Sequence, residues 1–152
     1  DKATALRFVI HIVPDLHMPL HAGKPGDRGA NDFKVKWFDA PQNLHWVWDV
    51  GMIEKQALSF SEYAERLEGR MQPEQVVEWW EPRPAIWLDE SIALRNRIYP
   101  TASAEFGNGT MEAPFKLQYL YTYDWNAAME QRLQQAGIRM AAYLDWVFAE
   151  AR

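Results

Sequence analysis

The chain contains no cysteine among its 152 residues. Disulfide bonds and thiolate metal ligands are therefore excluded, so a metal site would have to use histidine, carboxylate or backbone groups. No stretch reaches the roughly 18–20 apolar residues that a membrane-spanning helix needs. Internal repeats and low-complexity tracts are also absent, which argues against repeat and fibrous architectures. The sequence thus predicts a globular protein without a membrane span.

Positive charge is scarce as well. Lysine and arginine number 16 against 21 acidic residues, which gives a formal net charge of −5. This balance is unusual for a protein that binds nucleic acid, because such a protein must approach many phosphates. Bound divalent cations would offset the net negative charge at the point where a phosphate binds. Apolar residues make up 48% of the chain, with eight tryptophans, enough for one domain spanning residues 1–152 to bury a core.

Histidine is also rare, and its four copies all fall within the first 45 residues: His11, His17, His21 and His45. His11 precedes Asp15 by four positions, and His45 precedes Asp49 by four. Residues four apart on a helix share one face, and imidazole with carboxylate is a zinc ligand set. One such pair alone is more typical of a surface hydrogen bond. Two pairs, with His11 in the apolar run 6–13 where an unpaired polar group would be costly, favour a metal site.

The same residues resemble a known family. His11-x3-Asp15-x5-His21, read with the Asp-Leu-His-Met-Pro-Leu-His run of 15–21, resembles the HxxxDxHxPLH signature of the S1/P1 nuclease family. These are zinc-dependent nucleases that act on single strands. The resemblance continues through 26–32 and through 43–49, where the family carries NLHxxWD. It extends over essentially the whole chain and is weaker over 56–85.

Carried over residue by residue, the resemblance implies a zinc centre of three ions. Asp15 matches a carboxylate that bridges two buried zinc ions, and His11 matches a ligand of one of them. His21, His45 and Asp49 match the complete protein ligand set of the third, more exposed zinc. The expected catalytic residues are therefore Asp15, His21, His45 and Asp49.

Two further residues of these motifs receive other roles. Asn31, in the family-like Gly-x-Asn position, follows the glycine-rich loop of residues 23–30. It is the candidate for contact with a substrate or cofactor, or for holding this loop. His17 lies inside the signature but does not match a metal ligand. We expect it to support the ligands or to pack in the interior.

By resemblance, the protein is an endonuclease that hydrolyses phosphodiester bonds of single-stranded DNA and RNA. Its products would carry a 5′-phosphate, and 3′-nucleotidase activity is a further expectation. Two alternatives stay open: a phospholipase C-like zinc phosphodiesterase, and an inactive fragment that binds one structural zinc. The resemblance also implies a secreted or periplasmic protein, because family members expose their N-terminus by removing a signal peptide.

The chain departs from the family at its start. Family members begin with a tryptophan whose terminal amino group binds zinc, and further ligands follow it before the signature. Here Asp1 stands ten residues before His11. We therefore expect an N-terminally incomplete zinc nuclease domain in which one zinc site is complete. The remaining ligands would lie on a missing segment, which another chain could supply.

The periodicity predicts an all-α fold with at most a small β-hairpin, which agrees with the helical phospholipase C/P1 nuclease fold that the resemblance implies. An apolar run from Thr4 to about Leu16 predicts a buried helix. A strand is predicted at 33–37, turned by 39–43, and Asn43 is a good N-cap for the helix that carries His45. Further helices are predicted near 60–69, 73–80 and 85–98, and 100–118 is predicted to be loop-rich.

The last predicted helix begins near Asp124 and is amphipathic. Its apolar residues recur at intervals of three or four and predict one face packed on the core: Met129, Leu133, Ala136, Met140, Leu144 and Val147.

Overall fold

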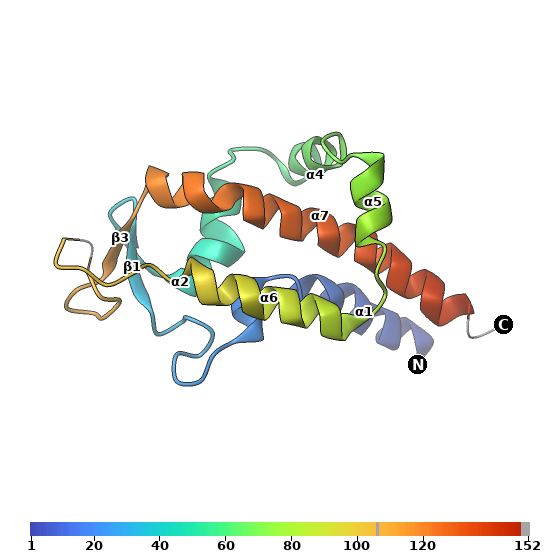
Figure 1. The fold of residues 1–152 in the computed structure, drawn as a ribbon, viewed down its shortest axis with the longest axis horizontal. Coiled ribbons are helices and arrows are strands. Elements are labelled where there is room, and N and C mark those ends of the chain that lie inside the picture. Colours follow the sequence, from blue (N-terminus) through green and yellow to red (C-terminus); the bar gives the residue numbers. More distant parts are fainter. Residues whose placement is uncertain (106, 150–152) are drawn as a thin grey trace.

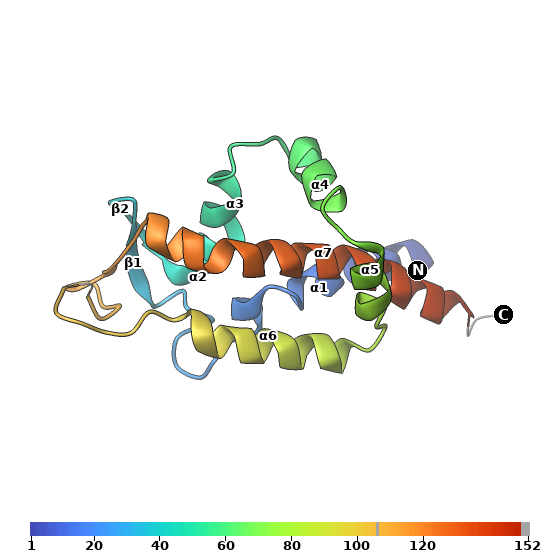
Figure 2. The same ribbon diagram turned by 45° about the horizontal axis from the view of Figure 1, so that its top comes forward.

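Long helices dominate the fold. The computed structural model describes residues 1–105 and 107–149. Helix α7 (Tyr119–Ala149) runs along the molecule, and α1 (Lys2–Asp15) packs against it (Figure 1). Helix α6 (Pro84–Ile98) extends nearby and runs in the opposite direction to α7, and the start of α1 lies at the same end of the molecule as the last described turn of α7 (Figure 2). Among the described residues, none of the helices combines the length and the apolar character needed to cross a bilayer.

Shorter elements connect these helices. Helices α4 (Phe60–Glu68) and α5 (Pro73–Trp79) contact α7 from one side (Figure 1). Each begins where a local signal predicts it, α4 after a Ser59/Glu62 capping box and α5 with its proline in the first turn. The remaining helical turns are η1 (Pro19–Ala22), α2 (Leu44–Trp46), the π-helical turn η2 (Val47–Gly51) and α3 (Met52–Glu54).

A small sheet closes one end of the molecule. Strands β1 (Lys34–Trp37) and β2 (Ala40–Asn43) form an antiparallel hairpin, and β3 (Phe115–Leu117) pairs with β1 in parallel. The hairpin turn consists of Phe38 and Asp39, whose φ values of 46° and 72° suit a tight turn that follows the twist of the strands. The predicted turn over 39–43 is therefore wrong in extent, because 40–43 forms an edge strand.

The predicted fold class is confirmed: the chain is mainly helical, with a small sheet. The third strand was missed, since β3 lies in the segment predicted as loop-rich. The core fills the space between the sheet, the 44–52 segment and α7. Its buried apolar residues include Leu20, Val35, Trp37, Leu44, Val47, Trp48, Met52, Ile98, Phe115, Leu117, Tyr121 and Met129.

Helix α1 forms as predicted, but the prediction that it is buried is wrong. Leu6, Phe8, Ile10 and Ile12 are 39%, 61%, 52% and 47% exposed, and Val13 is the buried residue of α1. An apolar run specifies a helix through its own residues, whereas its burial depends on a partner surface that α7 provides along only one side. His11 therefore lies on an exposed helix rather than in a core.

The predicted apolar face of α7 needs a second correction. The helix begins at Tyr119 instead of Asp124, and Leu133 and Val147 are each 37% exposed. Met129 and Ala136 are buried as predicted. Two arginines and a glutamine also occupy the inner face, because α6 and the segment after α1 offer polar partners there: Arg132, Gln135 and Arg139.

Candidate metal centre

His21 is presented by a short turn anchored in the core. Pro19 opens η1, and Leu20, at 1% exposure, is buried next to it. The backbone N–H of His21 donates to the carbonyl of Met18 over 3.1 Å. Leu20 is buried, whereas the side chain of His21 is 28% exposed and lies beside the Asp15 and Asp49 carboxylates.

The glycine-rich loop orients His45. The side chain of Asn43 accepts a hydrogen bond from the Trp46 N–H over 2.8 Å, which confirms Asn43 as the predicted N-cap. One ring nitrogen of His45, Nδ1, donates to the carbonyl of Gly29 over 2.7 Å. Gly29 has φ +65°, and a Cβ there would lie 2.7 Å from the carbonyl oxygen of Leu20. Glycine is therefore needed for the loop to come close enough to hold His45.

Asp49 lies in the π-helical turn that follows. Such turns are rare and occur frequently at functional sites. Val47 and Trp48 of this turn are buried, whereas the Asp49 side chain is 34% exposed. At the end of the turn, a Cβ on Gly51 would lie 2.8 Å from a ring carbon of Trp46. The turn thus packs tightly on its inner side and presents its carboxylate on the outer side.

The three side chains converge on one point. His45 Nε2 lies 3.1 Å from Asp49 Oδ2, and His21 Nε2 lies 3.5 Å from Asp49 Oδ1. The two imidazole rings are 5.1 Å apart between centroids. One ligand atom from each of the three residues falls within 4.8 Å of the others.

Charge couples these groups. The hydrogen bond to Asp49 raises the pKa of both His21 and His45, against the opposing effect of burial. Burial works against ionisation of Asp49, but hydrogen bonds and charge from the two imidazoles outweigh it and hold the pKa of that carboxyl below its usual range. A cation at this point would meet an ionised carboxylate and would compete with protons for two imidazole nitrogens.

His11 and Asp15 extend the cluster outward. His11 Nε2 lies 3.3 Å from Asp15 Oδ2, and Asp15 Oδ1 lies 3.5 Å from His21 Nδ1. Their side chains are 76% and 41% exposed. The structure therefore joins all five predicted ligands into one chain of contacts. Within the described residues, the group whose ligand atoms converge closely enough for a metal ion is His21, His45 and Asp49.

This donor set fits zinc. A catalytic zinc site can be formed by two imidazole nitrogens and one carboxylate oxygen, with the fourth coordination position open to water or substrate. Ligand histidines characteristically donate their second N–H to a carbonyl or carboxylate, as His45 does to Gly29. That this centre binds zinc stays a prediction, and the geometry is suited to it.

Asn31 makes two hydrogen bonds with neighbouring residues of the chain. Its side-chain N–H donates to the carbonyl of Arg28 over 3.0 Å, and the backbone carbonyl of Asn31 accepts from Lys34 Nζ over 2.8 Å. Contact between Asn31 and a substrate stays a prediction.

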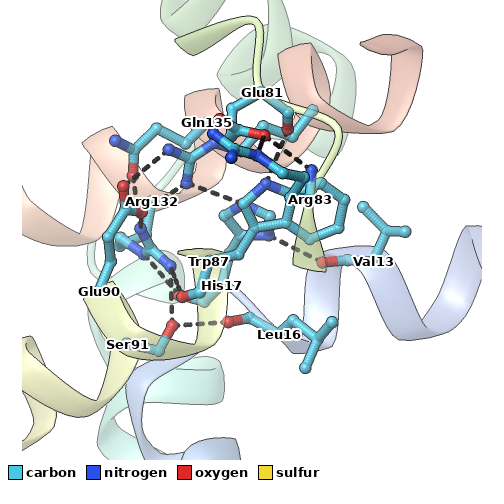
Figure 3. Close-up of polar contacts among 11 residues, drawn as sticks. Val13, Leu16, His17, Glu81, Arg83, Trp87, Glu90, Ser91, Arg132 and Gln135 are labelled. Atoms are coloured by element: carbon cyan, nitrogen blue, oxygen red, sulfur yellow. Dashed lines mark hydrogen bonds and ion pairs between the residues drawn. The ribbon is translucent and has the colours of Figure 1, made fainter. Parts of the chain in front are cut away.

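His17 is not part of the converging ligand group, and it is 2% exposed. Its Nδ1 donates to the carbonyl of Val13 over 2.8 Å, and its ring lies 5.2 Å from that of Trp87 (Figure 3). Burial lowers the pKa of His17 to about 4, and neighbouring arginines act in the same direction. The imidazole is therefore neutral near pH 7 and packs in the interior, as expected for a histidine that is not a ligand.

A polar network around His17 was missed by the sequence reasoning. It brings together Glu90, Ser91, Arg132 and Gln135 from α6 and α7 (Figure 3). Arg139 of α7 joins it through Glu90. The available signal was the polar character of positions 132, 135 and 139, which share one helix face and interrupt the apolar pattern of α7.

Comparison with known proteins agrees with the motifs. A family model described as S1/P1 Nuclease matches residues 1–149. Endonuclease 3 of Arabidopsis thaliana is 32% identical over 97% of this chain and 52% of its own length, and Endonuclease 2 of the same plant is 29% identical over 95% and 51%. Nuclease S1 of Aspergillus oryzae is 26% identical over 99% of this chain and 56% of its own length. The chain thus spans about half the length of these curated relatives.

Proposed function

The chain belongs to the S1/P1 nuclease family, and from this we propose that its His21, His45 and Asp49 bind zinc in an endonuclease acting on single-stranded DNA and RNA. The observation that carries the proposal is the convergence of three zinc-type ligand atoms within 4.8 Å. The relatives named above, which include Endonuclease 2 and Nuclease S1, are nucleases, and this supports the reaction class.

In the proposed function, the residues of the centre bind the zinc ion and orient its ligands. A bound zinc ion would act as a Lewis acid that polarises a phosphate oxygen and stabilises the negative charge that develops on the phosphate in the transition state of hydrolysis. Asp49 offsets part of the cationic charge, and the Gly29 carbonyl fixes the ring of His45. The His21 and Asp49 side chains are 28% and 34% exposed, so a phosphate of a nucleic acid strand can reach this side of the centre.

Asp15 and His11 take a neighbouring role in this proposal. Asp15 contacts both His11 and His21, so its carboxylate lies between the converging centre and the outer surface of α1. We assign Asp15 and His11 as ligands that this chain contributes to a further pair of zinc ions beside the first.

The test is cleavage of matched substrates. Zinc-loaded protein is incubated with a single-stranded oligonucleotide, with the same sequence as a duplex, and with single-stranded RNA. The proposal expects cleavage of single strands to products with a 5′-phosphate, and loss of both zinc and cleavage in His45→Ala and Asp49→Ala. Retained zinc content and retained cleavage in these variants would contradict the assignment.

A phospholipase C-like activity is the second candidate, since phosphodiester hydrolysis by the same ligand set would serve a lipid headgroup. Hydrolysis of phosphatidylcholine vesicles without cleavage of oligonucleotides would favour it. Zinc binding without hydrolysis of either substrate would instead favour a structural zinc site in this chain.

A further inference from the structure

The segment between Asp15 and His21 is held by its backbone carbonyls. The Leu16 carbonyl accepts from Ser91 Oγ over 2.6 Å, and the His17 carbonyl accepts from Arg132 Nε over 3.0 Å (Figure 3). Ser91 lies on α6 and Arg132 on α7. Two helices far along the chain therefore fix the backbone that connects one candidate ligand to the next.

Arg132 uses its whole guanidinium in this arrangement. Besides the His17 carbonyl, its Nη1 donates to Glu90 over 2.6 Å and to Gln135 over 2.7 Å. Its Nη2 donates to the Trp87 carbonyl over 3.0 Å and to Ser91 Oγ over 2.7 Å. The five N–H donors of an arginine are thus all used, on a side chain that is 8% exposed. Lysine, with three donors on one compact charge, could not replace this planar fork.

Glu90 joins this arginine to a second one. Its carboxylate accepts from Arg132 and, in a bidentate pair of 2.5 and 2.8 Å, from Arg139. Nη1 of Arg139 also lies 3.3 Å from His17 Nε2. Because the Nδ1 of His17 donates to a carbonyl, its Nε2 is the acceptor in this contact. Backbone and side chain of the same residue are therefore held by the two arginines together.

The far side of the His21 turn is held in a similar way. Arg95 of α6 donates from Nη1 to the Ala22 carbonyl over 2.6 Å and also to the carbonyl of Gly23. The backbone on both sides of His21 is therefore fixed by α6 and α7. Burying charged groups is rarely the most stabilising way to fill a core. A network of charged groups that binds these carbonyls therefore indicates that the position of the backbone around His21 matters.

We propose that Arg132, with Ser91 and Glu90, is a positioning residue that fixes the Leu16–His17 backbone and thereby sets Asp15 and His21 in place for the metal centre. The inference rests on the proposed zinc function. Arg132 does not touch the converging ligand atoms, so it acts through the segment that carries them. Its removal should loosen the geometry of the centre and leave the ligands themselves intact.

The experiment measures zinc affinity in folded variants of the full 152-residue chain. Zn²⁺ dissociation constants come from competition with a chromophoric chelator, and Co²⁺ absorption spectra report ligand geometry. Arg132→Lys is the main variant and Ser91→Ala the milder one. Arg70→Lys is the matched control, because Arg70 pairs with Glu130 on α7 at 54% exposure and away from this segment.

Arg132→Lys is expected to weaken zinc binding about 10–100-fold, as for other groups that orient metal ligands, and to alter the Co²⁺ spectrum. Ser91→Ala should act in the same direction with smaller effect, and Arg70→Lys should match the wild type. A purely structural role would lower the melting temperature without moving either readout.

The outcomes separate the two proposals. A wild-type chain that binds no zinc overturns the proposed function and this inference with it. A wild-type chain that binds zinc, beside a folded Arg132→Lys variant with the same affinity and spectrum, overturns the positioning role alone. If Arg132→Lys does not fold, Ser91→Ala and Glu90→Gln decide the question, and unchanged affinity in both would overturn it.

Discussion

Lowering the pH from 7 to 5 should remove about 2 kcal/mol of folding stability through His17 alone. In the folded protein the imidazole is 2% exposed, and burial lowers its pKa from 6.5 to about 4. Protonation would also remove the acceptor that Arg139 uses and would place a third cation beside two arginines. The folded state therefore resists protonation, whereas the unfolded chain does not.

The direction and size follow from linkage. Because the folded pKa lies below the unfolded one, the stabilisation is present above pH 6.5 and is lost as the pH falls toward 4. One pKa unit corresponds to about 1.4 kcal/mol, so the full loss is about 3 kcal/mol once the pH is below both values. Most of this loss falls between pH 6.5 and pH 4.

The assay is urea unfolding of the metal-free protein at pH 7, 6 and 5, compared with a His17→Asn variant. Asparagine keeps an N–H donor near the position of Nδ1 but takes up no proton in this range. The stability advantage of the wild type over His17→Asn should shrink by about 2 kcal/mol between pH 7 and pH 5. An advantage that stays constant over this range would refute the reasoning.

Three further predictions test the loop, the core and the centre. Gly29→Ala should destabilise the fold by about 1–3 kcal/mol and weaken zinc binding, because its φ is +65° and a Cβ would lie 2.7 Å from a carbonyl oxygen. The control is Gly137→Ala in helix α7, where the added Cβ would meet no other group within 4 Å outside the helix's own backbone. This substitution should raise the free energy of unfolding by about 0.5–1 kcal/mol. Equal changes for the two variants in urea unfolding would contradict the role given to Gly29. Tyr121→Phe should lower the free energy of unfolding by about 1–3 kcal/mol, because the buried hydroxyl accepts from the Trp48 indole N–H and donates to the Ile98 carbonyl, each over 2.8 Å. Its control, Tyr123→Phe, changes a side chain that is 84% exposed and should be nearly neutral in urea unfolding. Zinc affinity should fall as the pH drops, and the fall should begin above pH 6.5. The hydrogen bond to Asp49 raises the pKa of His21 and His45, and zinc needs both imidazoles neutral. Zinc titrations at pH 8, 7 and 6 that give the same dissociation constant would contradict this prediction.

Local signals explain why much of the fold could be predicted from the sequence. A proline in the first turn of α5 and of α6, and a capping box before α4, specify where these helices begin. The candidate ligands were found for a similar reason, because a four-residue spacing on one helix brings His45 and Asp49 together without help from the rest of the chain.

Long-range contacts explain what was missed. Strand β3 has three residues, and it forms because Phe115 and Leu117 find partners on β1 about 80 residues earlier. The arginines of α7 are buried because Glu90 and the His17 carbonyl are available to them, which no spacing along α7 reveals. The exposure of α1 likewise depends on which surfaces are present beside it.

Zinc content measured on metal-loaded, dialysed protein tests the central claim most directly. We expect at least one tightly held zinc ion per chain, bound through the three-ligand site. We also expect the loss of that ion in His45→Ala, whose fold is checked by circular dichroism. A wild-type chain without zinc, or a folded His45→Ala variant that retains it, would contradict the claim that His21, His45 and Asp49 form the metal centre.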